Sequence, residues 1–167
     1  MIDHQERREK YMPEIVKVLF IAESPPKNDT FFYSAKGNFY NFTKQIFDEL
    51  FNDEIKKADS FLQFFQNKGC YLDDLCHKPK PFKEIRSNKN FYIKELQNRL
   101  KSYNPQVIII TLKRINGFVR GAIKQSNISI APELIFTLPF PGYGHQNKYE
   151  SGLRDALNDP IVKNILT

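Results

Sequence analysis

Alternation between strand-like and helix-like segments is the feature that most constrains how this chain folds. Short apolar runs rich in β-branched residues predict strands over residues 16–22, 71–76, 107–111 and 134–138. Helices are predicted over residues 38–51, 55–67, 91–103 and 113–124, and from residue 148 onward. Strands that alternate with helices in this way form right-handed βαβ units. We therefore expect an α/β fold, a three-layer αβα sandwich around a four-stranded parallel sheet, in one domain spanning residues 1–167.

Composition is that of a globular protein and argues against several other classes. Of the 167 residues, 41% are hydrophobic and 26% are charged, which is unlike a disordered chain. No apolar run reaches the roughly 18 residues of a bilayer span, and residues 1–10 are too charged for a signal peptide. Cys70 and Cys76 are too few to form a structural zinc site or an iron–sulfur cluster alone. We expect a cytoplasmic monomer with reduced thiols, no membrane partner, and no metal or cofactor.

The charge of the chain favours an anionic partner. Twenty-five Lys and Arg residues against 19 Asp and Glu residues give a net charge of +6. Much of the excess lies in two stretches, residues 77–89 and 113–124, which carry Lys78, Lys80, Lys83, Arg86, Lys89, Lys113, Arg114, Arg120 and Lys124. Both stretches begin where a predicted strand ends, so we expect them to flank one cleft. The alternative is a basic surface that serves solubility alone.

The loops that follow the predicted strands carry the residues that could perform chemistry. Ligands of parallel α/β sheets bind beyond the carboxyl ends of the strands. The loops at that edge are residues 23–37, 73–89, 111–114 and 139–147. They contain polar side chains and aromatic rings, namely Glu23, Asp73, Asp74, Thr111, His145, Phe31, Phe32, Tyr33, Phe140 and Tyr143. Such a set suits a pocket for a planar, polar ring, because aromatic side chains stack on the ring and polar groups bind its edge.

Each of these residues also has a structural interpretation. Glu23 could cap a helix or pair with a lysine, and His145 could be a helix cap or a surface residue. Asp73 and Asp74 could be turn or cap residues, and because side chains alternate along a strand only one of them is expected to face the pocket. The aromatic run 31–33 could be loop packing. The sequence alone leaves these alternatives open.

Several segments resemble the motifs of the uracil-DNA glycosylase superfamily. Residues 21–26 (IAESPP) resemble its first, GExPG-like motif, and residues 31–33 resemble the loop whose aromatic ring stacks on a flipped base. Residues 103–108 (YNPQVI) resemble the start of its third strand. Residues 71–79 (YLDDLCHKP) stand where the family reads the base with an Asn, and residues 138–149 stand where it has a His-Pro-Ser loop. Here Asp73 or Asp74 replaces the Asn and Phe140 replaces the His, while the four cysteines of the cluster-bearing branches are missing.

The resemblance implies a sheet order of 2-1-3-4 and hydrolysis of the N-glycosidic bond of a flipped, damaged or deaminated base in DNA. It implies that Glu23 positions water or acts as general base and that Asp74 contacts the base edge. Phe32 or a neighbour would stack on the base, and His145 would stabilise negative charge or hold a phosphate. Tyr143 would fill the gap left in the duplex. The full set of expected base contacts is Phe31, Phe32, Tyr33, Asp73, Asp74 and Phe140. The expected DNA contacts are Lys78, Lys80, Lys83, Arg86, Lys113, Arg114, Tyr143, Gln146, Asn147 and Lys148.

Two other functions remain open at this point. The same fold could hold nucleic acid or a nucleobase without cleaving it, which the replacement of the family His by Phe140 favours. It could also act on small nucleosides or nucleotides, with the basic residues binding a phosphate.

Overall fold

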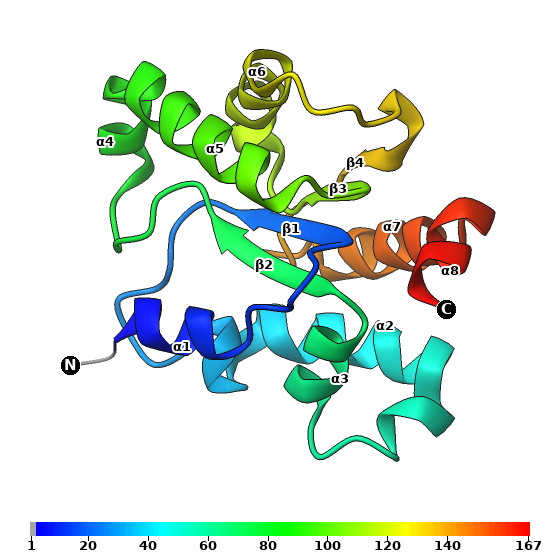
Figure 1. Cartoon of the computed structure of the whole chain (residues 1–167). Helices are drawn as coiled ribbons and strands as arrows, with labels where there is room; N and C mark the ends of the chain where they lie inside the picture. The colour runs from blue at the N-terminus through cyan, green and yellow to red at the C-terminus, as the bar shows by residue number, and fades with distance from the viewer. Residues whose placement is uncertain (1–2) are drawn as a thin grey trace.

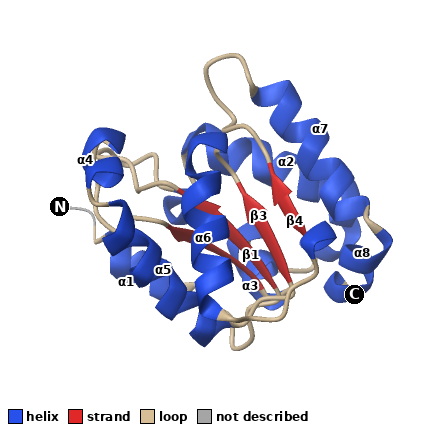
Figure 2. Ribbon diagram, turned by 90° about the horizontal axis from the view of Figure 1, so that it is seen from above, coloured by secondary structure: helices blue, strands red, loops and turns tan. Residues whose placement is uncertain are grey.

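A four-stranded parallel sheet forms the centre of the molecule. The computed structural model describes residues 3–167, and its strands are β1 (Val18–Ala22), β2 (Cys70–Asp74), β3 (Val107–Ile110) and β4 (Ile135–Thr137). Their order is β2-β1-β3-β4 and every pairing is parallel, which confirms the predicted fold class and order (Figures 1 and 2). The register places Ile21 of β1 beside Asp73 and Ile110, so the carboxyl ends of three strands meet at one edge.

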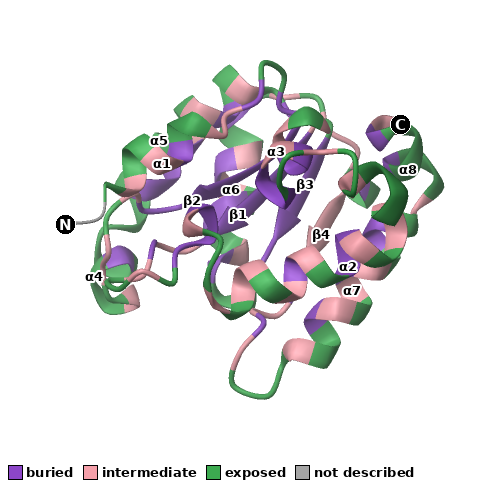
Figure 3. Ribbon diagram, turned by 90° about the horizontal axis from the view of Figure 1, so that it is seen from below, coloured by how far each residue is buried: buried purple, intermediate pink, exposed green. Residues whose placement is uncertain are grey.

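Helices cover both faces of this sheet. Helices α5 (Lys89–Tyr103) and α6 (Asn116–Ser126) lie on one face, and α2 (Gly37–Ile55), α3 (Phe61–Asn67) and α7 (Gln146–Asn158) lie on the other (Figures 1 and 2). Helix α8 (Pro160–Leu166) packs against α7. Strands β1, β2 and β3 are buried throughout, whereas the helices around them carry many exposed positions (Figure 3). Burial on both faces explains why β1 and β3 are continuous apolar runs rather than alternating ones.

Three segments differ from the predicted helices. Residues 56–60 are not helical, because α2 ends at Ile55 and α3 begins only after Ser60, whose hydroxyl accepts a hydrogen bond from the Gln63 N–H. The segment 77–89, predicted to be a loop, contains helix α4 (Phe82–Ser87), which is anchored by buried Ile85. Residues 4–10, which show only charge in the sequence, form helix α1 (His4–Lys10). This helix contributes buried Arg8 to the interior beside the end of β2.

Aromatic rings fill much of the core between the sheet and helices α2 and α3. Phe65 lies 5.3 Å from Phe20, 5.6 Å from Phe47 and 5.4 Å from Phe32, measured between ring centroids. These rings pack with tilted or edge-on geometry, which is favourable for aromatic pairs. The cluster therefore fixes Phe32, which follows β1, against a rigid support. Within residues 3–167, no helix has the length and apolar character that spanning a bilayer requires.

Candidate functional site

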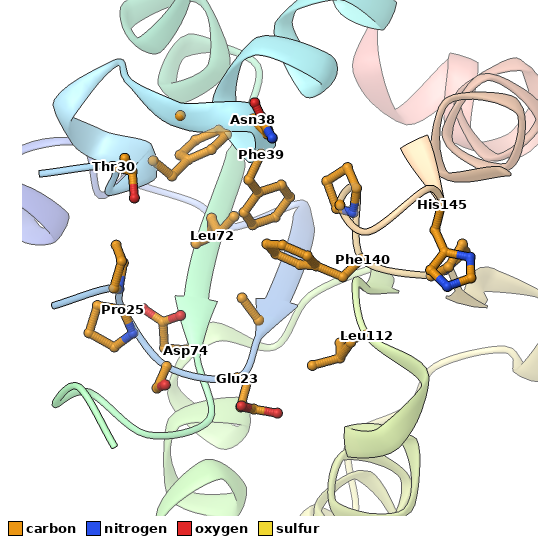
Figure 4. A pocket seen from close by; sticks show the side chains of 18 of the residues that line it. Glu23, Pro25, Thr30, Asn38, Phe39, Leu72, Asp74, Leu112, Phe140 and His145 are labelled. Carbon is orange, nitrogen blue, oxygen red and sulfur yellow. The ribbon is translucent and has the colours of Figure 1, made fainter. Parts of the chain in front are cut away.

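A pocket of about 870 Å³ opens at the carboxyl edge of the sheet. Residues after β1, at the end of β2, after β3 and after β4 all line it, as expected from the position of ligands in parallel sheets. Figure 4 shows Asp74 and Glu23 on one side of this space, with Phe39 and Phe140 across from them. Of the residues predicted as site residues, those that line the pocket are Glu23, Phe31, Phe32, Asp74, Lys113, Arg114, Phe140, Tyr143, His145 and Lys148.

Aromatic side chains form one wall of the pocket. The rings of Phe39 and Phe140 lie 5.6 Å apart, and Phe39 also contacts Phe32 at 5.5 Å and Tyr149 at 5.9 Å. Phe31 and Phe32 are each 2% exposed, so they support the wall more than they present a surface. Phe39 and Phe140 are only half-buried and are therefore the rings available to stack on a ligand. Sequence reasoning had placed Phe39 on a helix face and not in the site.

Glu23 lies at the pocket in an ion pair with Arg114. Arg114 Nε and Nη2 each donate a hydrogen bond of 2.6 Å to a different oxygen of the carboxylate. The Glu23 side chain is 13% exposed and that of Arg114 is 53% exposed. The guanidinium also stacks over the Phe82 ring, with 4.5 Å between the guanidinium carbon and the ring centroid. The hydrogen bonds from Arg114 to Glu23 raise the pKa of Arg114, so its guanidinium is charged at neutral pH.

Asp74 lies at the end of β2 and reaches the pocket from a buried position. Its side chain is 3% exposed, and its Oδ2 accepts a hydrogen bond of 2.6 Å from Arg8 Nη2. Burial raises the pKa of Asp74 to about 6, although the charge of Arg8 and its hydrogen bond act in the opposite direction. Arg8 is 1% exposed and comes from α1, a segment that the sequence analysis did not connect to the site. The charge of the Asp74 carboxylate is therefore stabilised by an arginine that lies 66 residues away in the sequence but in direct contact with it.

Asp73 points away from the pocket, although it was predicted as a base contact. His77 Nε2 lies 2.7 Å from its Oδ1, and Arg99 Nε and the Tyr103 hydroxyl donate to Oδ2 at 2.7 and 3.2 Å. Burial alone would raise the pKa of Asp73, but the hydrogen bond from His77 and the charges of Arg99, His77 and Arg8 lower it to about 2. Asp73 is thus a buried anion that holds β2 to α5. The expectation that only one of the two aspartates faces the pocket is met by Asp74.

Tyr33 also lies outside the pocket lining and has a structural role. Its hydroxyl donates to the Leu72 carbonyl at 2.9 Å and accepts from the Leu72 N–H at 2.7 Å. Strand β2 is at the edge of the sheet, so these two bonds satisfy backbone groups that no neighbouring strand reaches. For Tyr33, loop packing is the interpretation that its contacts support.

Basic side chains border the pocket unevenly. Lys113, Arg114 and Lys148 line it. Tyr143, on the loop before α7, also lines the pocket but is 99% exposed, and its backbone has a positive φ of 53°. Four other predicted DNA contacts, Lys78, Lys80, Lys83 and Arg86, are not among the lining residues and lie on the loop after β2 and on α4. That loop is tied to the pocket by a hydrogen bond of 3.3 Å from the Ser24 hydroxyl to the Lys80 carbonyl. Gln146 and Asn147 lie on the first turn of α7, also outside the lining.

His145 is at the pocket but apart from the carboxylates. It is exposed, occupies the position before α7, and makes no side-chain capping bond there. Figure 4 shows its ring well separated from Glu23 and Asp74. Among residues 3–167, His, Cys, Asp and Glu side chains form no group of three or more that could hold a metal ion. The pocket lining thus contains two carboxylates that are each paired with an arginine, Glu23 with Arg114 and Asp74 with Arg8.

The sequence matches neither a model of a known protein family nor a curated protein.

Proposed function

We propose that this chain binds DNA at the carboxyl edge of its sheet and hydrolyses the N-glycosidic bond of a base turned out into the pocket. The observation that carries the proposal is the convergence of half-buried aromatic rings and two carboxylates on one pocket beside basic side chains. Phe39 and Phe140 form the aromatic side, and Glu23 and Asp74 form the acidic side. Enzymes that act on a base in duplex DNA extrude it into a pocket of this kind and hold it by stacking and edge contacts.

The basic residues at the pocket suit a phosphate backbone. Lys113 and Arg114 lie in the 3-10 turn after β3, Lys148 lies in the first turn of α7, and all three line one pocket. Contacts of Lys and Arg to phosphates supply most sequence-independent affinity for DNA. We assign Tyr143, which is fully exposed on the loop between β4 and α7, to the space that an extruded base leaves in the duplex.

Glu23 is the group that we assign to the attacking water. Water adds to the sugar C1′, the C1′–N bond breaks, and its electron pair leaves on the base nitrogen. A water proton passes to the Glu23 carboxylate. Both oxygens of Glu23 accept hydrogen bonds from Arg114 in the unbound protein, and we expect one of these bonds to be released when the attacking water binds to Glu23. Because half of the Arg114 side chain is exposed, a phosphate of the bound strand can compete for its guanidinium and free a carboxylate oxygen.

One observation favours a second function, binding of nucleic acid or a nucleobase without cleavage. The carboxylate that would accept the proton is fully engaged by Arg114, and His145 stands apart from it. If the pair stays closed when DNA binds, the pocket can hold a base while the Glu23 carboxylate stays bound to Arg114 instead of to a water.

Oligonucleotides that carry one uracil, hypoxanthine, xanthine or mismatched thymine, and oligonucleotides that carry a mismatched cytosine or adenine, test the proposal. Abasic sites are detected as alkali-sensitive breaks, and DNA affinity is measured in parallel. For Glu23→Gln we expect retained binding and a loss of rate of about 10²- to 10⁴-fold, because an amide cannot accept the proton. Glu49→Gln is the matched control, since Glu49 makes a similar two-bond pair with Arg154 on α2 and α7, outside the pocket.

Each outcome has a distinct meaning. Binding without breaks, in the wild type and in both variants, would support the second function. A chain that neither binds nor cleaves any of the oligonucleotides contradicts both.

A further inference from the structure

The position of the Asp74 carboxylate restricts which base edge the pocket can accept. Oδ2 accepts the hydrogen bond from Arg8, and within residues 3–167 Oδ1 accepts none. The residue lines the pocket although its side chain is 3% exposed, so its remaining surface opens into the pocket. Figure 4 shows the side chain beside Pro25 and below Leu72, facing the space in front of Phe39 and Phe140.

The backbone of Asp74 is fixed on both sides, so this orientation is rigid. Its N–H donates to Asp73 Oδ1 at 2.9 Å, and its carbonyl accepts from Arg99 Nη2 at 2.8 Å. Arg8 in turn donates from Nη1 to Gln5 Oε1 at 3.1 Å. The carboxylate therefore cannot rotate freely to exchange its two oxygens, and one acceptor atom is held toward the ligand.

An ionised carboxylate offers acceptors and no donor. A base that lies against the aromatic side with its edge at Asp74 must therefore supply an N–H. An exocyclic amino group meets this requirement without placing an oxygen near the carboxylate. The ring N–H of uracil or thymine lies between two carbonyl oxygens, which would be brought close to an anion in a poorly hydrated place.

We infer that Asp74 makes the pocket selective for a base with an amino group at its pairing edge over the corresponding base with a carbonyl there. This inference rests on the proposed function, because it assumes that the pocket receives a nucleobase. It concerns specificity alone, so the two can fail separately. Arg8 acts as a positioning residue for this selectivity, since it fixes which carboxylate oxygen faces the base.

Matched pairs of bases provide the test. Cytosine and uracil differ at the pairing edge by an amino group and a carbonyl at position 4, and adenine and hypoxanthine differ in the same way at position 6. We would measure the affinity and cleavage of four duplexes that carry one of these bases in a mismatch. Titration with the four free nucleosides, followed by NMR, tests the same preference without DNA. We expect the amino member of each pair to be favoured by about tenfold or more.

Asp74→Asn should reverse this preference. Arg8 can only donate, so it holds the amide oxygen and turns the amide NH₂ toward the pocket, where it donates to a carbonyl. Asp48→Asn is the matched control, because it makes the same change from carboxylate to amide on α2, outside the lining of this pocket. It should leave the preference unchanged.

The outcomes separate the two proposals. The inference is overturned if the wild type prefers the carbonyl members, or if a folded Asp74→Asn protein shows the same ratio of amino to carbonyl preference as the wild type. In either case, binding or cleavage that depends on the base still supports the proposed function. If Asp74→Asn fails to fold, the wild-type ratio over both pairs decides. If no duplex is bound, the proposed function fails, and the titration with nucleosides then tests the inference. Equal binding of all four nucleosides, or no binding of any, would contradict the inference.

Discussion

The buried pair of Arg8 and Asp74 predicts an unusual response to the loss of its positive member. Arg8→Met keeps an unbranched apolar side chain in place but leaves the Asp74 carboxylate without its partner at 3% exposure. Removal of one partner from a buried ion pair typically costs about 3–5 kcal/mol, because the remaining charge is uncompensated. We expect a loss of this size in the free energy of unfolding at pH 8.

The cost should depend on pH in a defined direction. Burial already raises the pKa of Asp74 from 3.8 to about 6 in the wild type, and Arg8 lowers it, so without Arg8 the pKa of the folded protein must lie above 6. Between pH 6 and that higher value, the folded variant holds a proton that the unfolded chain has released. Stability then falls as pH rises, by up to about 1.4 kcal/mol per pH unit. The wild-type carboxylate, with a pKa of about 6 in the folded protein, gives such a slope only between 3.8 and about 6, and this slope has faded at pH 7 and pH 8.

Urea denaturation at pH 5, 6, 7 and 8 measures this effect. Arg7→Met is the control on the same helix, because the Arg7 side chain is 40% exposed and its pair with Asp29 should contribute less than about 1 kcal/mol. The double variant Arg8→Met/Asp74→Asn should recover much of the loss above pH 6, since it removes the unpaired charge. A cost for Arg8→Met that equals that of Arg7→Met, or that stays constant from pH 5 to pH 8, would refute the reasoning.

Two further predictions concern the pocket rim and the sheet edge. Lys113→Glu with Lys148→Glu should weaken binding to all DNA sequences and reduce the slope of log affinity against log salt by about 2. Lys80→Glu with Lys83→Glu should have a smaller effect because neither residue lines the pocket. Fluorescence anisotropy at several salt concentrations measures both double variants. Equal effects would show that Lys80 and Lys83 contact DNA as Lys113 and Lys148 do. Tyr33→Phe should lower the free energy of unfolding by about 1–3 kcal/mol, because the N–H and carbonyl of Leu72 lose their shared partner. Urea denaturation measures this loss, and an unchanged transition midpoint would mean that water replaces the hydroxyl at no cost.

The sequence was sufficient to predict the sheet and most of the pocket. Strands such as β1 and β3 carry unbroken apolar runs because both of their faces are covered, and this signal is local. Once the order of elements is known, the carboxyl-edge rule brings the residues after each strand together. That rule correctly grouped Glu23, Asp74 and Phe140, which are far apart in the chain.

What the sequence could not provide depends on long-range contacts. Arg8 lies in a charged segment with no apolar periodicity, and the carboxylates that compensate its buried charge, Asp74 and Asp73, are more than 60 residues away in the sequence. Tyr33 and Phe32 are adjacent and similar, but the 3-10 turn over Phe32–Ser34 directs them to different neighbours. Helix α4 has one fully buried apolar residue, Ile85, which is too weak a pattern to distinguish a short helix from a loop. In each case, the structure is decided by a contact with a residue far away in the sequence, which a local sequence pattern does not show.

The link between α1 and β2 also bears on the order in which the protein assembles during synthesis. Arg8 and Asp74 are 66 residues apart, so α1 cannot bury its arginine against β2 until β2 has left the ribosome. The pocket lining begins at Ala22, after α1, yet the Asp74 carboxylate in that lining is held in place by α1. A chain that lacks residues 1–10 would keep every lining residue and lose the guanidinium that neutralises Asp74.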